Sequence, residues 1–176
     1  MGISIPIKST EEINRIKDLL RRKNQISELL MFTLAINTGL ELKELLNLKV
    51  KDVRNKQYLK IDKVKVMPLS EDLIALIKEV ASKRKGDEYL FQGASGEKFH
   101  RTTIFHFFKN ICTELGFSDK YSVASWRKTF AYHYYMKYKD LSYLQWLFNQ
   151  TNIKLALKFI DVDENMNLRY REGVCL

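Results

Sequence analysis

Apolar residues recur every three or four positions along most of this chain, which is the spacing that gathers them on one face of an α-helix. Ser9 and Glu12 stand at capping-box spacing before one such run, and Ile13 and Ile16 continue it. The 7 glycines and 2 prolines among the 176 residues form no linker-like or low-complexity segment. We therefore expect one domain that is mainly helical.

The period changes between residues 58 and 67, where short apolar runs predict two strands, with Asp62–Lys63 as a poor hairpin turn between them. The run Tyr89–Phe91 predicts a small third strand, and Gly39 predicts the end of a helix. The expected fold class is therefore α+β, mainly α with a small antiparallel β-sheet. Helices are expected at about 9–20, 25–37, 41–48, 70–80 and 103–115, and two or three more between 122 and 162.

Positive charge dominates the chain, with 30 basic and 21 acidic residues and a net charge of +9. Seven of the basic residues fall between Lys49 and Lys65, where only Asp52 and Asp62 oppose them. This density suits a polyanionic partner. It also suits an exposed hairpin whose lysines block edge-to-edge aggregation. Charge density alone does not choose between these two interpretations.

Several classes of protein are not favoured by the sequence. No apolar run is long enough to span a bilayer, and the N-terminus lacks a signal-peptide pattern, so we expect a cytoplasmic protein. Cys112 and Cys175 are far apart, which favours free thiols over a disulfide. Neither the cysteines nor the three histidines have metal-ligand spacing, so we expect no metal and no cofactor.

Three segments resemble, in order, the signature boxes of tyrosine recombinase (phage integrase) catalytic domains. LAINTGLELKELL (34–46) resembles T-G-x-R-x-x-E-L, SWRKTFA (125–131) resembles H-x-L-R-[HK]-T-F-A, and NQTNIKLALKFIDV (149–162) resembles N-H-S-S-x-K-V-T-L-R-Y-I. In the family, the second histidine and the tyrosine lie 23 and 32 residues past the second arginine. The same distances from Arg127 lead to Gln150 and Phe159. The resemblance covers roughly residues 10 to 162.

The resemblance implies an enzyme class in which a tyrosine hydroxyl attacks a DNA phosphodiester and the 5′ hydroxyl leaves. Two arginines hold the phosphate oxygens, and a lysine and two histidines hold or move protons. Four of these six roles are lost here. The first arginine, the first histidine, the second histidine and the tyrosine are replaced, in that order, by Glu41, Ala124, Gln150 and Phe159. Arg127 and the hairpin residue Lys60 are retained.

We therefore expect a catalytically inactive protein that binds double-stranded DNA, such as a regulator of phage or mobile-element origin. The residues expected to contact DNA are Lys60, Lys63, Lys65, Arg101, Lys109, Arg127, Lys128, Lys154 and Lys158. For Lys128, Lys154 and Lys158, solvated surface charge is an equal alternative. Arg127 is either a phosphate contact or a structural arginine, and Glu41 could form an internal ion pair with it. Glu44, Trp126 and Phe130 are expected to be structural.

The resemblance also sets the expected domain organisation: one domain over 1–176, with a core at about 10–162 and a tail at 163–176. The N-terminal core-binding domain that relatives carry is expected to be absent. An alternative function is protein interaction, because recombinases assemble homo-oligomers by passing a C-terminal segment to a neighbour. A less favoured third is a divergent active site-specific recombinase that uses Tyr170, which lies 43 residues past Arg127. Salt-sensitive DNA binding separates the first two functions, and a covalent DNA adduct would favour the third.

Overall fold

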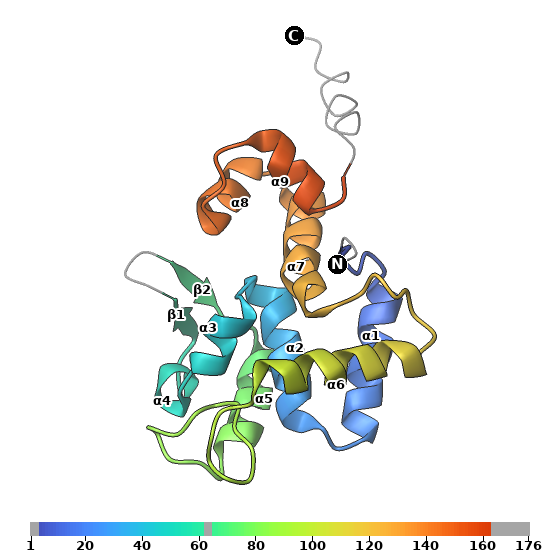
Figure 1. Ribbon diagram of the computed structural model, residues 1–176. Coiled ribbons are helices and arrows are strands. Elements are labelled where there is room, and N and C mark those ends of the chain that lie inside the picture. The colour runs from blue at the N-terminus through green and yellow to red at the C-terminus, as the bar shows by residue number, and fades with distance from the viewer. Residues whose placement is uncertain (1–3, 62–64, 163–176) are drawn as a thin grey trace.

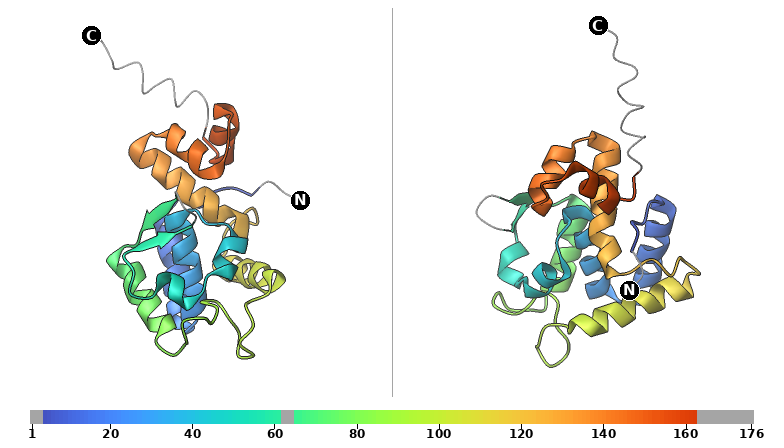
Figure 2. Two further views of the ribbon diagram at one scale, coloured as in Figure 1. Left: turned by 90° about the vertical axis from the view of Figure 1, so that its left-hand side faces the viewer. Right: turned by 45° about the horizontal axis from the view of Figure 1, so that its top comes forward.

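A computed structural model describes residues 4–61 and 65–162. Those residues form nine helices and one two-stranded sheet (Figure 1). The helices are α1 (Thr10–Arg22), α2 (Ile26–Thr38), α3 (Leu42–Asn47), α4 (Val50–Val53), α5 (Glu71–Ala81), α6 (Arg101–Glu114), α7 (Val123–Tyr138), α8 (Leu141–Phe148) and α9 (Ile153–Phe159), and the strands are β1 (Tyr58–Lys60) and β2 (Val66–Pro68). Helix α2 runs through the middle, and α7 leads from it to the α8–α9 pair (Figures 1 and 2).

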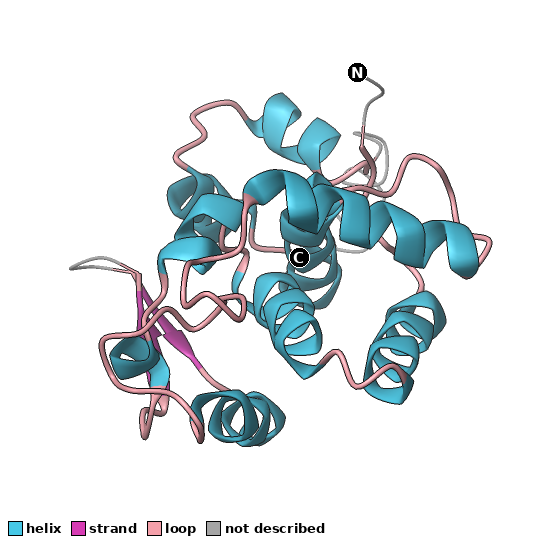
Figure 3. Ribbon diagram, turned by 60° about the horizontal axis from the view of Figure 1, so that its bottom comes forward, coloured by secondary structure: helices cyan, strands magenta, loops and turns pink. Residues whose placement is uncertain are grey.

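The predicted fold class is confirmed, since the chain is mainly helical and its two strands pair antiparallel, with Leu59 opposite Met67 (Figure 3). The five helices for which the sequence predicts both ends begin and end within two residues of the predicted positions. Local chemistry explains this agreement. The Ser9 hydroxyl accepts a hydrogen bond from the Glu12 backbone N–H at 3.2 Å, and Ser70 caps α5 in the same way. Such caps satisfy backbone donors that have no partner inside the helix.

The third predicted strand is wrong. Tyr89 pairs with Lys49 in a single antiparallel bridge, and no strand forms at Tyr89–Phe91. The apolar character of this run comes from burial instead, because Leu90 and Phe91 are fully buried. The short helix α4 was not predicted. The predicted Asp62–Lys63 turn and the tail at 163–176, including Tyr170, lie outside the described residues.

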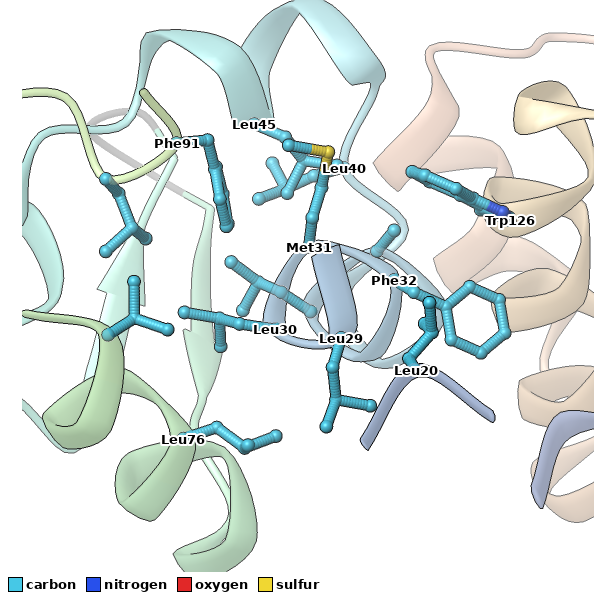
Figure 4. Close-up of a cluster of buried hydrophobic side chains, with 14 of the residues drawn as sticks. Leu20, Leu29, Leu30, Met31, Phe32, Leu40, Leu45, Leu76, Phe91 and Trp126 are labelled. Atoms are coloured by element: carbon cyan, nitrogen blue, oxygen red, sulfur yellow. The ribbon is translucent and has the colours of Figure 1, made fainter. Parts of the chain in front are cut away.

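The core surrounds α2, where nearly every side chain from Leu29 to Ala35 is buried. Trp126 of α7 packs edge-on against Phe32, with ring centroids 5.8 Å apart (Figure 4). Its ring also lies edge-on to that of Phe108, with centroids 5.1 Å apart. Trp126 and Phe130 are 2% and 9% exposed, which confirms both as packing residues. A second apolar cluster joins the outer half of α7 to α8 and α9. The first cluster fixes α7 against α2, and the second fixes α8 and α9 against α7.

Gly39 ends α2, as predicted, and it also sets the distance between α2 and α7. Its φ is +69°, a left-handed conformation that glycine adopts without a steric penalty. A Cβ placed on Gly39 would lie 2.7 Å from Cδ1 of Phe130. A side chain at residue 39 would therefore push α7 away from the segment that leads into α3.

The segment before α1 lies against α7. The Ile7 backbone N–H donates to the Thr129 hydroxyl at 2.9 Å, and Ile7 itself is fully buried. Lys8 reaches the other end of the chain, where its Nζ lies 2.7 Å from a carboxylate oxygen of Asp161. These contacts tie residues near the N-terminus to both α7 and the end of α9.

Candidate functional site

A pocket of about 260 Å³ lies where the start of α3, the start of α6, the first turns of α7 and the end of α9 meet. Four of the six positions singled out from the sequence line it: Glu41, Ala124, Arg127 and Phe159. Ala124 and Arg127 lie one turn apart on α7, whereas Glu41 and Phe159 come from distant segments that the packing of α7 against its neighbours brings to them. We call this cavity the arginine pocket.

Glu41 is positioned by the helix that follows it. It is the residue before α3, and its backbone N–H donates to the Glu44 carboxylate at 2.7 Å. This contact confirms that Glu44 is structural, since it caps the helix start. The cap directs the Glu41 side chain toward α7, where it meets Arg127.

The predicted ion pair between Glu41 and Arg127 is confirmed, because an Arg127 guanidinium nitrogen donates directly to a carboxylate oxygen of Glu41. The Arg127 side chain is 19% exposed, whereas that of Glu41 is 59% exposed. The other contact of the guanidinium is aromatic: its Cζ lies 4.4 Å from the ring centroid of Phe148. A cation over a ring face is held by the electrons of that ring. Arg127 therefore lies between a carboxylate and a phenyl ring.

Lys128 faces inward and is not the solvated charge that one alternative predicted. Its Nζ donates to the Ser4 carbonyl at 2.6 Å and lies 5.3 Å from the ring centroid of Phe159. Burial lowers the pKa of Lys128, because the charged form loses hydration there. The rings of Phe159 and Phe148 are 5.4 Å apart. The wall formed by these two rings has no hydroxyl group.

The lining of the arginine pocket is basic. Within the described part of the chain, four lining side chains carry positive charge and Glu41 alone carries negative charge; the cations are Lys43, Arg101, Arg127 and Lys128. A concave surface with this excess concentrates anions near it. The pocket can therefore hold an anionic group, in competition with the Glu41 carboxylate.

Five other predicted DNA contacts, all within the described residues, do not line this pocket. Lys60 is exposed on β1 opposite Val66, and Lys63 lies outside the described residues. Lys65 donates from Nζ to the Leu147 carbonyl at 3.0 Å, which joins the hairpin to α8. The remaining three are exposed: Lys109 on α6, and Lys154 and Lys158 on α9.

Gln150, which replaces the second histidine of the family, also lies outside the lining of the arginine pocket. Its side-chain oxygen is buried and makes no hydrogen bond within the described part of the chain. Two residues of the site were missed from the sequence: Lys43, which lines the pocket, and Phe148, whose ring lies against the Arg127 guanidinium. Lys43 lies two residues past Glu41, and Phe148 directly precedes the third box. A basic residue within the first box is a usable signal, whereas the contact of Phe148 depends on how α8 folds back.

Metal-binding clusters and membrane-spanning helices are both absent from residues 4–61 and 65–162. These ranges contain no group of three or more histidine, cysteine, aspartate or glutamate residues placed to hold a metal ion. In the same ranges, no helix has the length and apolar character needed to cross a membrane.

Known proteins match this chain both in sequence and in structure. The model of the phage integrase family matches residues 9–166. The Bacillus subtilis (strain 168) protein named "Probable integrase/recombinase YoeC" is 31% identical over 171 residues, which cover 94% of this chain and 93% of that protein.

Solved structures match the fold along nearly the whole chain. The Tn1549 transposon integrase in complex with circular intermediate DNA matches with a TM-score of 0.79 and 15% identity, over 99% of this chain and 66% of that one. A tyrosine-to-phenylalanine variant of that integrase, in complex with transposon right end DNA, matches with a TM-score of 0.78 and 14% identity, over 98% of this chain and 66% of that one. XerA recombinase matches with a TM-score of 0.77 and 15% identity, over 100% of this chain and 66% of that one. The chain thus spans about two thirds of the length of these solved chains.

Proposed function

We propose that this chain, which belongs to the phage integrase family, binds double-stranded DNA around the arginine pocket and does not cleave it. A regulatory role at DNA sites used by active recombinases would follow from such binding. The observation that carries the proposal is the ion pair between Glu41 and Arg127 in a pocket whose nucleophile position is Phe159.

The loss of the nucleophile supports the absence of cleavage. Strand transfer through a covalent intermediate needs a side-chain oxygen that can form an ester with phosphorus. Phe159 has no such atom, and its ring is packed against Phe148. Phe159 can therefore contribute packing to the pocket and no covalent chemistry.

The Glu41 carboxylate also supports the absence of cleavage, because it opposes the binding of a phosphate in the transition state. A phosphodiester that gains charge in the transition state needs two preorganised cations near its free oxygens. Here one of those positions carries negative charge, and that charge engages the cation at the other. Arg127 must release Glu41 before it can contact a phosphate, and Glu41 then repels the bound phosphate.

Two facts support DNA as the partner. The net charge is +9, and four cations surround the arginine pocket. Moreover, the phenylalanine variant of the Tn1549 integrase is in complex with DNA, so that loss of a tyrosine hydroxyl is compatible with DNA binding in a protein of this fold.

The test combines binding and cleavage on one substrate. A labelled duplex is titrated with the protein between about 50 and 200 mM salt, and we expect affinity to fall steeply because phosphate contacts release counterions. The same mixtures are then denatured and separated to detect covalent protein–DNA adducts, and we expect none. Absence of binding even at low salt overturns the DNA-binding proposal, and an adduct overturns the inactivity.

A further inference from the structure

A second pocket, of about 640 Å³, adjoins the arginine pocket, and Lys43 and Arg101 line both. Its other walls come from α3, from Tyr89 and from residues 96–100 before α6. We propose that this cavity, the tyrosine pocket, binds one unstacked nucleotide of the bound DNA, with its base on Tyr89 and its phosphate between Lys43 and Arg101. This inference rests on the proposed function, because the nucleotide comes from the DNA strand.

Tyr89 is held rigidly enough to serve as a stacking surface. It lies in an antiparallel bridge with Lys49, and the residues on either side fix that bridge through Val50 N–H to Glu88 O at 3.0 Å and Leu90 N–H to Leu48 O at 2.8 Å. Leu90 is fully buried, so the backbone that follows Tyr89 is anchored in the core. An aromatic residue on an anchored backbone stacks a base without the cost of ordering that backbone.

Two cations flank the Tyr89 ring. The Nζ atoms of Lys49 and Lys98 lie 5.8 and 5.6 Å from its centroid. Lys98 is itself positioned, because it donates to the Asn47 side-chain oxygen at 2.6 Å. Two positive charges this close to an aromatic ring favour a ligand that is both flat and anionic, which describes a nucleotide better than an uncharged aromatic molecule. A base that stacks on Tyr89 takes the place of the ammonium group over that face of the ring.

The phosphate position follows from the residues shared by the two pockets. Lys43 and Arg101 are both exposed, and Arg101 lies in the first turn of the 14-residue helix α6. The positive end of the helix dipole adds to these two charges. Among the described residues that line the tyrosine pocket, Glu97 is the only acidic one.

The sizes of the two pockets suggest different occupants. A volume of about 640 Å³ is ample for a base and its sugar, whereas about 260 Å³ suits a phosphate group. Since the pockets share Lys43 and Arg101, a strand whose phosphate enters the arginine pocket brings the neighbouring nucleotide to the tyrosine pocket. That nucleotide can reach Tyr89 only if its base leaves the stack, which costs least where the base is unpaired.

The experiment compares two duplexes that differ only by one central unpaired adenosine. We expect anisotropy to give an affinity about tenfold higher for the bulged duplex, within the range of one base stacked on an aromatic ring. Tyr89→Leu should lose this preference and keep its affinity for the matched duplex, whereas Tyr89→Trp should keep the preference. Tyr138→Leu is the matched control, because Tyr138 is 57% exposed on α7 and does not line the pocket.

Titration with deoxyadenosine monophosphate alone, followed through the aromatic proton resonances, distinguishes a strand nucleotide from a free one. Equal affinity for the two duplexes, or a preference that persists in Tyr89→Leu, overturns the inference. If the free nucleotide binds at Tyr89 without any preference for the bulged duplex, a strand nucleotide is also ruled out as the ligand. In each case, salt-sensitive binding of the matched duplex still supports the proposed function. A failure of the tyrosine-pocket inference is therefore distinguishable from a failure of the proposed DNA binding.

Discussion

The carboxylate of Glu41 pairs with the guanidinium of Arg127 and so joins the start of α3 to the second turn of α7. Two positions that carry arginine in the related boxes thus hold a neutral pair. The pair is partly exposed, so its contribution to folding stability is small, typically about 0–1 kcal/mol for such pairs. Its main effect is on what else Arg127 can bind.

Glu41→Gln should therefore strengthen DNA binding. The change keeps the shape of the side chain, removes its charge and leaves Arg127 available to phosphate. We expect affinity to rise by up to about fivefold near 100 mM salt, since an exposed pair is worth at most ~1 kcal/mol. The plot of the logarithm of the binding constant against the logarithm of the salt concentration should become steeper by about 0.9, which corresponds to one more phosphate contact. Glu114→Gln, at the far end of α6, is the control, and an unchanged affinity for Glu41→Gln would contradict the prediction.

Phe159→Tyr alone should not produce a recombinase. It restores a hydroxyl, but Glu41 still opposes the phosphate and Ala124 supplies no proton donor. We expect no covalent adduct on a nicked suicide duplex with this variant. A variant that also carries Glu41→Arg, Ala124→His and Gln150→His is the informative comparison. Adduct formation by Phe159→Tyr alone would show that the remaining residues suffice for chemistry.

Gly39→Ala should destabilise the fold markedly. The added methyl group would meet Phe130, and alanine is strained at a φ of +69°. We expect a loss of about 2–4 kcal/mol, which combines backbone strain with overpacking. Gly96→Ala separates the two causes, because Gly96 has a φ of +81° but open space around it. Chemical denaturation should show a loss of only about 1 kcal/mol for that control.

The thiol of Cys112 should resist modification until the protein unfolds. Burial raises the pKa of Cys112 to about 12, so the reactive thiolate is scarce in the folded state at pH 8. In a Cys175→Ser background, a thiol reagent should therefore react slowly with native protein and rapidly in denaturant.

The raised pKa of Cys112 also makes the free energy of unfolding depend on pH. The thiol of the unfolded chain ionises near its ordinary pKa of 9.0, so stability is full below that pH and falls as pH rises toward 12.

The sequence carried the local features of the fold and only part of the site. The serine caps and Gly39 act within a few residues of themselves, so spacing alone predicts where α1, α2 and α5 begin or end. The contacts of Phe148 and Lys128 depend on segments that are distant in the chain. No periodicity reports that Phe148 covers Arg127, or that Lys128 turns toward Ser4.

The position of Tyr89 in the tyrosine pocket was also not predictable from the sequence. The run Tyr89–Phe91 consists of aromatic and aliphatic residues, which predict a strand. What places it is a single bridge to Lys49 and the burial of the two residues that follow. β-propensity measures how well a side chain fits a half-buried surface, so it does not distinguish an isolated bridge from a sheet.

Contacts between segments far apart in the chain limit how early during synthesis the arginine pocket can form. Lys8 bonds to Asp161, 153 residues further along the chain, and Ile7 is buried only once α7 is in place. Contacts of such long range form late, because the loop between their ends must close first. On the ribosome, α1 and α5 can pack against α2 early, whereas the part of α2 that contacts α7 stays uncovered until α7 emerges. The arginine pocket is complete only after α9 has left the exit tunnel, because Phe159 of α9 forms part of its lining.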